Sequence, residues 1–117
     1  MRMPLQINIE PFREQSFSVV AYDGEDRVGC VFVHELPRLT RGRAMYLVYD
    51  VDVAESHRRR GIASAMLERL AELAREQGIA EGFVLTESDN DAANGLYAKA
   101  GGRRSEVVMW DFEYGDA

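Results

Sequence analysis

The sequence predicts a single α/β domain on a mixed, mostly antiparallel sheet with two helices, in the order β-β-β-β-α-β-α-β. In the first half of the chain, short runs of alternating apolar and polar residues are separated by turn residues, a pattern typical of antiparallel strands. From Gly61 to Gln77, the apolar residues recur at helical spacing. The length of 117 residues suits one hydrophobic core, so we expect one domain over residues 1–117.

Four strands are expected in the first half. Residues 5–12 alternate apolar and polar side chains, and residues 16–23 and 27–36 form a hairpin around a short turn. A loop over residues 37–43 leads to a fourth strand at residues 44–54, which is rich in Tyr and Val.

The second half predicts two helices and two further strands. Residues 61–77 carry a helical apolar stripe, and Gly78 follows as the C-terminal stop. A short strand at residues 81–88 precedes a second helix within residues 89–101. The alternating sequence SEVVMWDFEY, residues 105–114, predicts a closing strand.

The chain is acidic, with 14 Lys and Arg against 20 Asp and Glu and a formal net charge of −6. An acidic surface repels phosphate backbones, so we expect no nucleic-acid partner, but it does not repel a cationic small molecule. The single cysteine, Cys30, excludes an intramolecular disulfide and is compatible with a reducing compartment. Because neither a signal peptide nor a membrane span is recognisable, we expect a cytoplasmic protein with no membrane partner.

Three consecutive arginines, Arg58, Arg59 and Arg60, stand directly before Gly61 and the first expected helix. A helix N-terminus presents free backbone N–H groups and the positive end of the helix dipole, which together attract anions. Glycine lets the backbone approach a phosphate closely, and arginines pair with phosphate oxygens. Residues 58–64 therefore indicate a diphosphate cradle. The alternative is a basic loop that caps a helix and binds no ligand.

Two motifs resemble those of the GCN5-related N-acetyltransferase (GNAT) superfamily. Its diphosphate motif, (R/Q)-x-x-G-x-(G/A), matches residues 58–63 between the fourth strand and the long helix. Its second signature, N-x-x-A-x-x-L-Y-x-K-x-G, is matched by Asn90, Ala93, Leu96, Tyr97, Lys99 and Gly101. The resemblance extends over roughly residues 45–112. Within the superfamily, the motifs look most like those of the aminoglycoside 3-N-acetyltransferases.

The resemblance implies a GNAT-like fold and acetyl-CoA as co-substrate. It also implies backbone amides around Val51 to Val53 that pair with the pantetheine arm and polarise the thioester carbonyl. The cofactor-binding residues that we expect are Val51, Val53, Arg58, Arg59, Arg60, Gly61, Ile62, Ala63, Ser64, Asn90 and Tyr97. Members usually carry two helices between the first and second strands, but only a few residues are available here, so we expect these helices to be absent.

The resemblance implies two catalytic residues, Tyr97 and Asp50. A phenol with a pKa near 10 is protonated at neutral pH, so Tyr97 can donate a proton to the leaving thiolate. The alternative for Tyr97 is a core tyrosine on an apolar helix face. An ammonium substrate must lose a proton, and Asp50, Asp52 and Glu87 are candidate acceptors.

Further acids could bind the other ammonium groups of a polycationic substrate. The acidic substrate-binding residues that we expect are Asp50, Asp52, Glu87, Asp111 and Glu113. The alternative for each is a solvated surface acid. No His or Cys cluster has metal-ligand spacing, so no metal is expected.

These features predict an acetyl-CoA-dependent N-acetyltransferase that acetylates a primary amine by direct transfer in a ternary complex. The substrate class is a small polycationic amine such as an aminoglycoside, which would connect the protein to antibiotic resistance. The alternatives are a CoA-binding module without transferase activity and an acetyltransferase of peptide or protein amines with an open groove. Without the N-terminal helices, strands and acceptor groove would be left bare, so we expect a homodimer in which a neighbour covers them.

Overall fold

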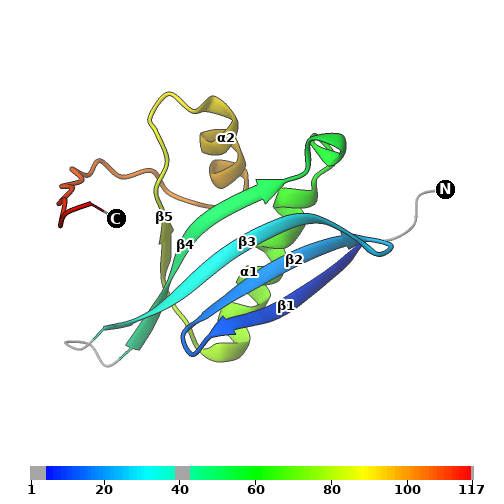
Figure 1. The fold of residues 1–117 in the computed structure, drawn as a ribbon, viewed down its shortest axis with the longest axis horizontal. Helices are drawn as coiled ribbons and strands as arrows, with labels where there is room; N and C mark the ends of the chain where they lie inside the picture. Colours follow the sequence, from blue (N-terminus) through cyan, green and yellow to red (C-terminus); the bar gives the residue numbers. More distant parts are fainter. Residues whose placement is uncertain (1–4, 39–42, 117) are drawn as a thin grey trace.

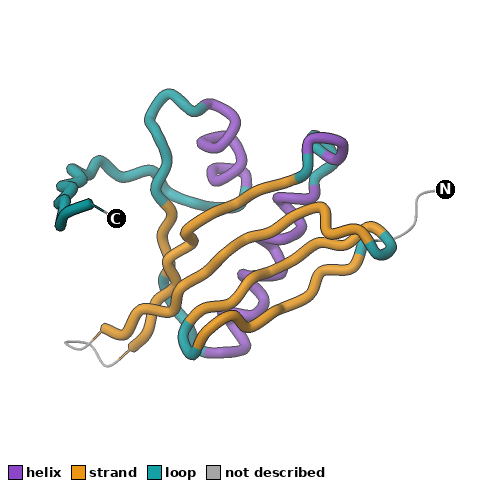
Figure 2. Tube along the Cα trace, viewed as in Figure 1, coloured by secondary structure: helices purple, strands orange, loops and turns teal. Residues whose placement is uncertain are grey.

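The computed structural model of the chain describes residues 5–38 and 43–116. The described strands form one sheet in the order β1-β2-β3-β4-β5, and α1 lies across one face of it (Figures 1 and 2). The first three pairings are antiparallel and β4 pairs with β5 in parallel. The elements are β1 (Gln6–Arg13), β2 (Ser16–Asp23), β3 (Asp26–Arg38), β4 (Arg43–Val53), η1 (Glu55–His57), α1 (Ile62–Gln77), β5 (Gly82–Val84) and α2 (Asp91–Lys99).

The sequence predicted the first four strands and both helices correctly. Both strands beside the predicted loop extend into it: β3 continues to Arg38 and β4 begins at Arg43. The rest of that loop, residues 39–42, lies outside the described residues. The fifth strand is shorter than expected, since only Gly82, Phe83 and Val84 pair with β4.

The expected absence of helices between the first two strands is confirmed. Only Glu14 and Gln15 separate the end of β1 from the start of β2. The two strands pair directly, with Pro11 opposite Phe17 next to the turn. A connection of this length has no room for a helix.

The prediction of a closing strand at residues 105–114 was wrong. This segment has no regular secondary structure, and it runs away from the sheet as the red end of the ribbon in Figure 1. Its apolar side chains are exposed; Val108 is 80% exposed and Trp110 79%. The alternation suits a strand, but a strand also needs a neighbour with which to form hydrogen bonds. No described strand occupies the edge of β5 opposite to β4.

The core lies between α1 and the face of the sheet that this helix covers. On β3, Gly29 permits the closest approach of the two layers, because a Cβ atom there would lie 2.9 Å from Met66 Cε and 3.2 Å from Ile62 Cγ2. The side chain of Met66 is fully buried. The buried cluster consists of Val19, Ala21, Val28, Val31, Val33, Tyr46, Ile62, Met66 and Leu70.

Neither described helix is both long and apolar enough to cross a membrane.

We expect Met66→Ala to reduce the free energy of unfolding by about 2–5 kcal/mol, because it leaves a cavity between α1 and β3. Glu72→Ala is the matched control on the exposed face of the same helix and should change it by less than about 0.5 kcal/mol. Urea unfolding measures both values. Equal values for the two variants would contradict the described packing of α1.

Candidate functional site: a parted sheet edge beside a basic helix start

The strands β4 and β5 pair over a short distance and then part. Their parallel pairing covers only Tyr46, Leu47 and Val48 of β4. Directly beyond, the register between β3 and β4 shifts, because Phe32 faces Asp50 while Val33 faces Val48. Tyr49 is therefore the extra residue of a β-bulge. From residue 49 to residue 53, β3 is the one described strand beside β4, and we call this stretch the open edge.

On the open edge, the backbone N–H and C=O groups of Val51 and Val53 point away from β3. The amide N of Ala54 donates to Val28 O at 2.7 Å, which fixes the position of the hydrogen-bonded pairs between β3 and β4. In antiparallel pairing these pairs alternate, so Asp52 and Asp50 bond to β3. The N–H and C=O groups of Val51 and Val53 consequently face away from β3. The structure thus aims the two predicted residues at the space where β4 and β5 part.

A basic loop with unusual backbone geometry leads into α1. Arg59 has φ 64° and Gly61, the N-cap, has φ 76°, so both adopt the left-handed conformation that favours glycine. The first hydrogen bond of the helix runs from Ala65 N to Gly61 O at 3.0 Å. The N–H groups of the three residues between them, Ile62 to Ser64, are therefore the free donors of the first turn.

The three arginines are exposed around this helix start. Arg58 Nε donates to Val53 O at 3.0 Å, which joins the basic loop to the open edge. No acidic residue stands in the first turn of α1. The local charge is positive in a chain that is acidic as a whole, and this arrangement fits an anionic group such as a diphosphate.

The sequence did not indicate the contact that anchors this loop. His57 Nε2 lies 2.8 Å from Asp23 Oδ2, and Ser56 Oγ lies 2.8 Å from His57 Nδ1. Asp23 ends β2, so the contact ties η1 to the turn between β2 and β3. Because 34 positions separate the two residues, no local pattern could reveal the pair.

In the structure, the charge of one predicted catalytic residue, Asp50, acts on the other, Tyr97. Burial raises the pKa of the Tyr97 phenol above its ordinary value of 10.0, and the negative charge of Asp50 raises that pKa further. Tyr97 lies on α2 and is half-buried, whereas Asp50 lies exposed on the open edge. A phenol in this setting keeps its proton throughout the neutral range, as a proton donor requires.

The remaining predicted acids lie in different surroundings. Asp52 shares the strand face of Asp50, since the two are separated by one residue, and it lines a cavity of about 220 Å³ with Arg27 and Cys30. Glu87 is exposed in the loop before α2. Asp111 and Glu113 are on the C-terminal segment that was wrongly predicted as a strand, so the structure does not unite them with Asp50 and Tyr97 (Figure 1).

Asn90 has a structural role that its motif did not predict. Its Oδ1 accepts a hydrogen bond from Ala93 N at 3.1 Å, so Asn90 is the N-cap of α2. Asn94, which the sequence analysis did not select, donates from Nδ2 to Glu87 O at 3.0 Å and to Asn90 O at 2.9 Å. These contacts fix the loop that precedes α2 and thereby the position of Tyr97.

Among residues 5–38 and 43–116, no three His, Cys, Asp or Glu side chains gather closely enough to hold a metal ion.

Sequence comparison assigns the chain to a family. The profile of the acetyltransferase (GNAT) family matches residues 2–102. The chain belongs to the GNAT family. It is 31% identical over 85 residues to an uncharacterized N-acetyltransferase, YycN, of Bacillus subtilis strain 168; the match covers 73% of this chain and 53% of that protein. The chain thus spans about half the length of this curated GNAT relative.

Solved structures of two aminoglycoside acetyltransferases share the fold. An aminoglycoside acetyltransferase, HMB0005, from an uncultured soil metagenomic sample superposes with a TM-score of 0.81 and 32% identity, over 88% of this chain and 68% of that one. A second, meta-AAC0020, also from a soil metagenomic sample, superposes with a TM-score of 0.83 over the same shares at 20% identity. At this lower identity the likeness concerns the fold alone.

We expect the Tyr97 phenol to titrate above pH 10, and the variant Asp50→Asn to move this titration to lower pH because it removes the neighbouring negative charge. Since the folded-state pKa is the raised one, the neutral phenol's contribution to stability is complete below about pH 10 and is lost as the pH rises further. NMR of the tyrosine ring carbons, with Tyr97→Phe to assign the signal, measures the shift. An unchanged titration in Asp50→Asn would contradict the electrostatic effect of Asp50 on Tyr97.

Proposed function

We propose that this protein transfers the acetyl group of acetyl-CoA to a primary amine of a small polycationic molecule such as an aminoglycoside. The observation that supports this most directly is the electrostatic effect of Asp50, on the open edge of β4, on the half-buried phenol of Tyr97. The likeness to HMB0005, at 32% identity, supports the substrate class. The single cysteine agrees with the cytoplasm as the site of action.

The residues of the chain fit the cofactor in two places. Family members use acetyl-CoA, whose diphosphate would meet the free N–H groups at the start of α1 and the charges of Arg58, Arg59 and Arg60. The outward N–H and C=O groups of Val51 and Val53 would pair with the amide groups of the pantetheine arm, as an added strand would. In the structure, Arg58 Nε donates a hydrogen bond to Val53 O. Arg58 would therefore lie between the diphosphate and the pantetheine arm of the bound cofactor.

Asp50 and Tyr97 would divide the proton transfers between them. Acetyl-CoA supplies the thioester carbonyl, and an outward N–H of the open edge would donate to its oxygen as negative charge develops. Asp50 would accept the proton that the substrate ammonium must lose, directly or through water. As the new N–C bond forms and the C–S bond breaks, Tyr97 would donate its proton to the leaving thiolate, and the second proton that the acylated nitrogen loses would restore the phenol. The raised pKa of Tyr97 keeps that proton available.

The acceptor would bind on the face of β4 that carries Asp50 and Asp52. Both acids are exposed, and a substrate with several ammonium groups can engage both. The two-residue turn between β1 and β2 leaves room for larger acceptors as well, which favours peptide amines as the second candidate class. Assays with an aminoglycoside, a peptide N-terminal amine and no amine distinguish these candidates from each other and from a CoA-binding module.

We expect thioester consumption to depend on the aminoglycoside, and Tyr97→Phe to lower kcat by a factor on the order of 10² with little change in the KM for acetyl-CoA. The variant removes only the hydroxyl, so packing of α2 is retained. Amine-independent thioester loss, or a Tyr97→Phe variant with the kcat of the parent, would contradict the proposal.

We expect Gly61→Val to weaken CoA binding about tenfold or more, roughly 1.4 kcal/mol, because the side chain obstructs the backbone approach to the diphosphate. Gly78→Val is a matched control, since Gly78 caps the other end of α1 with φ 72° and also has open space around its Cβ position. Both variants carry the strain of a β-branched residue at positive φ. Calorimetry with CoA compares them, and equal losses would show that backbone strain alone is responsible.

We also propose a homodimer in which a neighbouring copy covers an exposed edge of the sheet or the apolar C-terminal segment. Trp110, Phe112 and Tyr114 are each at least 70% exposed, and the outer edge of β1 has no described neighbour. Light scattering at micromolar concentration should give twice the mass of the chain. A monomer that acetylates a small amine efficiently would contradict this part of the proposal.

A further inference from the structure

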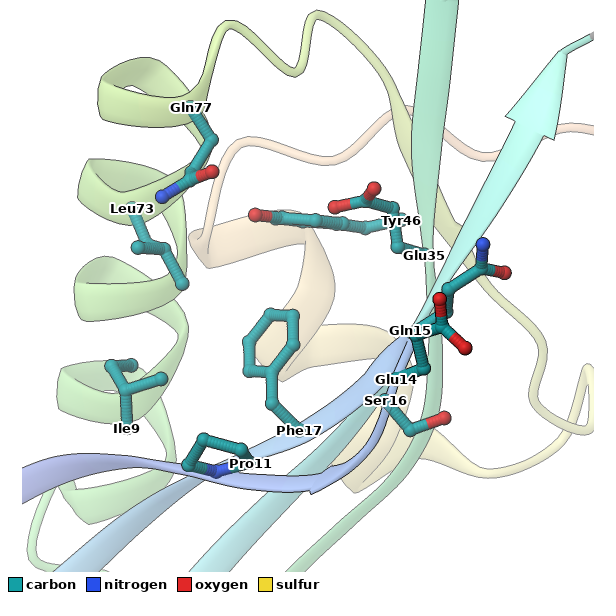
Figure 3. Close-up of a pocket in the computed structure, with 10 residues that line it drawn as sticks. All are labelled: Ile9, Pro11, Glu14, Gln15, Ser16, Phe17, Glu35, Tyr46, Leu73 and Gln77. Carbon is teal, nitrogen blue, oxygen red and sulfur yellow. The ribbon is translucent and has the colours of Figure 1, made fainter.

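A cavity of about 240 Å³ lies between the sheet and the C-terminal part of α1 (Figure 3). Its apolar wall includes Ile9, Phe17 and Leu73, and its polar residues include Tyr46 and Glu35. Leu73 is eleven residues beyond the first residue of α1, which corresponds to about 16 Å along the helix axis. The cavity is therefore separate from the basic loop at the N-terminal end of the same helix.

The Tyr46 side chain presents a polar group to this cavity. Tyr46 is only 4% exposed, and no described residue forms a hydrogen bond with its hydroxyl. Every fully enclosed side-chain N or O atom in the described part of the chain has a partner, so this hydroxyl must open on to the cavity. Figure 3 shows the hydroxyl extending toward Leu73 and Gln77. A hydroxyl that opens on to a cavity and has no described partner can bond to water or to a ligand there.

The charge around the cavity is negative. Glu14 and Glu35 line it, and the described lining residues include no Lys, Arg or His. Glu35 acts on Tyr46 directly, because the pKa of the phenol is raised first by burial and then by the negative charge of Glu35. A ligand with a positive charge would offset both carboxylates.

The aromatic rings at the cavity also favour a positively charged ligand. The ring centroids of Phe17 and Tyr46 are 5.5 Å apart with an interplanar angle of 70°. A cation near such ring faces is attracted by their quadrupoles. An apolar cavity of about 150 Å³ is enough to hold benzene, so this larger one can accept a compact ring together with its ammonium group.

We propose that this cavity is a second binding site, which takes a primary ammonium group on a compact apolar body. The ammonium donates hydrogen bonds to the Tyr46 hydroxyl oxygen and faces the Glu35 carboxylate, while the apolar body contacts Ile9, Phe17 and Leu73. The site goes beyond the proposed acetyl transfer and does not depend on it, because it shares no residue with the open edge or the basic loop.

Benzylammonium and benzyl alcohol test the proposal, because they have similar shape and differ in charge. Titrations of the whole chain are followed by NMR of the backbone amides at neutral pH. We expect benzylammonium to bind about tenfold more tightly than benzyl alcohol, as a charge-assisted hydrogen bond permits, with shifts at Ile9, Phe17 and Leu73.

Two variants locate the interaction. Glu35→Gln should weaken benzylammonium binding about tenfold and Tyr46→Phe about fivefold, whereas Glu72→Gln, an exposed acid of α1 outside the cavity, should have no effect. Glu35 is not part of the buried core, so its variant decides the test if Tyr46→Phe does not fold.

Three results would overturn the proposal. These are equal binding of the alcohol and the ammonium, undiminished binding to Glu35→Gln, and shifts that centre on Asp50 and Tyr97. The last result would place the probe at the acceptor site and would leave the proposed acetyl transfer intact.

Discussion

The pairing of β4 determines the rest of the candidate site. Over Tyr46, Leu47 and Val48 this strand has neighbours on both sides, and beyond the bulge at Tyr49 its one described neighbour is β3. Unpaired backbone groups next to a sheet interior are costly unless a partner satisfies them. At one of them, Val53 O, the structure supplies the side chain of Arg58. The open edge also carries Asp50. The separation of β4 from β5 therefore determines both where a ligand could form backbone hydrogen bonds and where the Asp50 carboxylate lies.

The helix α1 links this edge to the core. Its buried residues, Ile62, Met66 and Leu70, hold it against the sheet, and Gly29 allows the two layers to approach closely. This packing fixes the direction of the helix axis, so the free N–H groups of its first turn are held beside the open edge. The proposed binding at the helix start would therefore depend on core residues that lie away from the ligand. The contact of His57 with Asp23 adds a second anchor to the loop, on the side of the β2–β3 turn.

The face of the sheet opposite to α1 is only partly covered. Phe32 is the centre of an aromatic cluster on this face, with ring contacts to Phe12, His34 and Tyr49 at centroid distances between 4.9 and 6.5 Å. Ser16 Oγ lies 2.6 Å from His34 Nδ1 and orients that ring. Tyr49 is 68% exposed, so the cluster meets solvent next to Asp50. An acceptor that approaches Asp50 from this side meets aromatic rings as well as acids.

Local patterns in the sequence determined much of this protein. Alternation and helical spacing identified four strands and both helices, because each depends on side chains a few residues apart. The arginines and Gly61 indicated the anion site for the same reason, since a helix start and its cap are local features. The family motifs selected Asp50 and Tyr97, but local spacing alone did not show that the charge of Asp50 acts on Tyr97.

The tertiary structure decided the features that depend on distant neighbours. Residues 105–114 alternate as a strand does, yet no described strand pairs with them, and β5 pairs with β4 over three residues although β4 itself is longer. The contact of His57 with Asp23 and the cavity around Tyr46 unite residues from separate elements. A strand pairing, a side-chain hydrogen bond between distant residues and a cavity each need groups from two or more elements, and one stretch of sequence supplies only one of them.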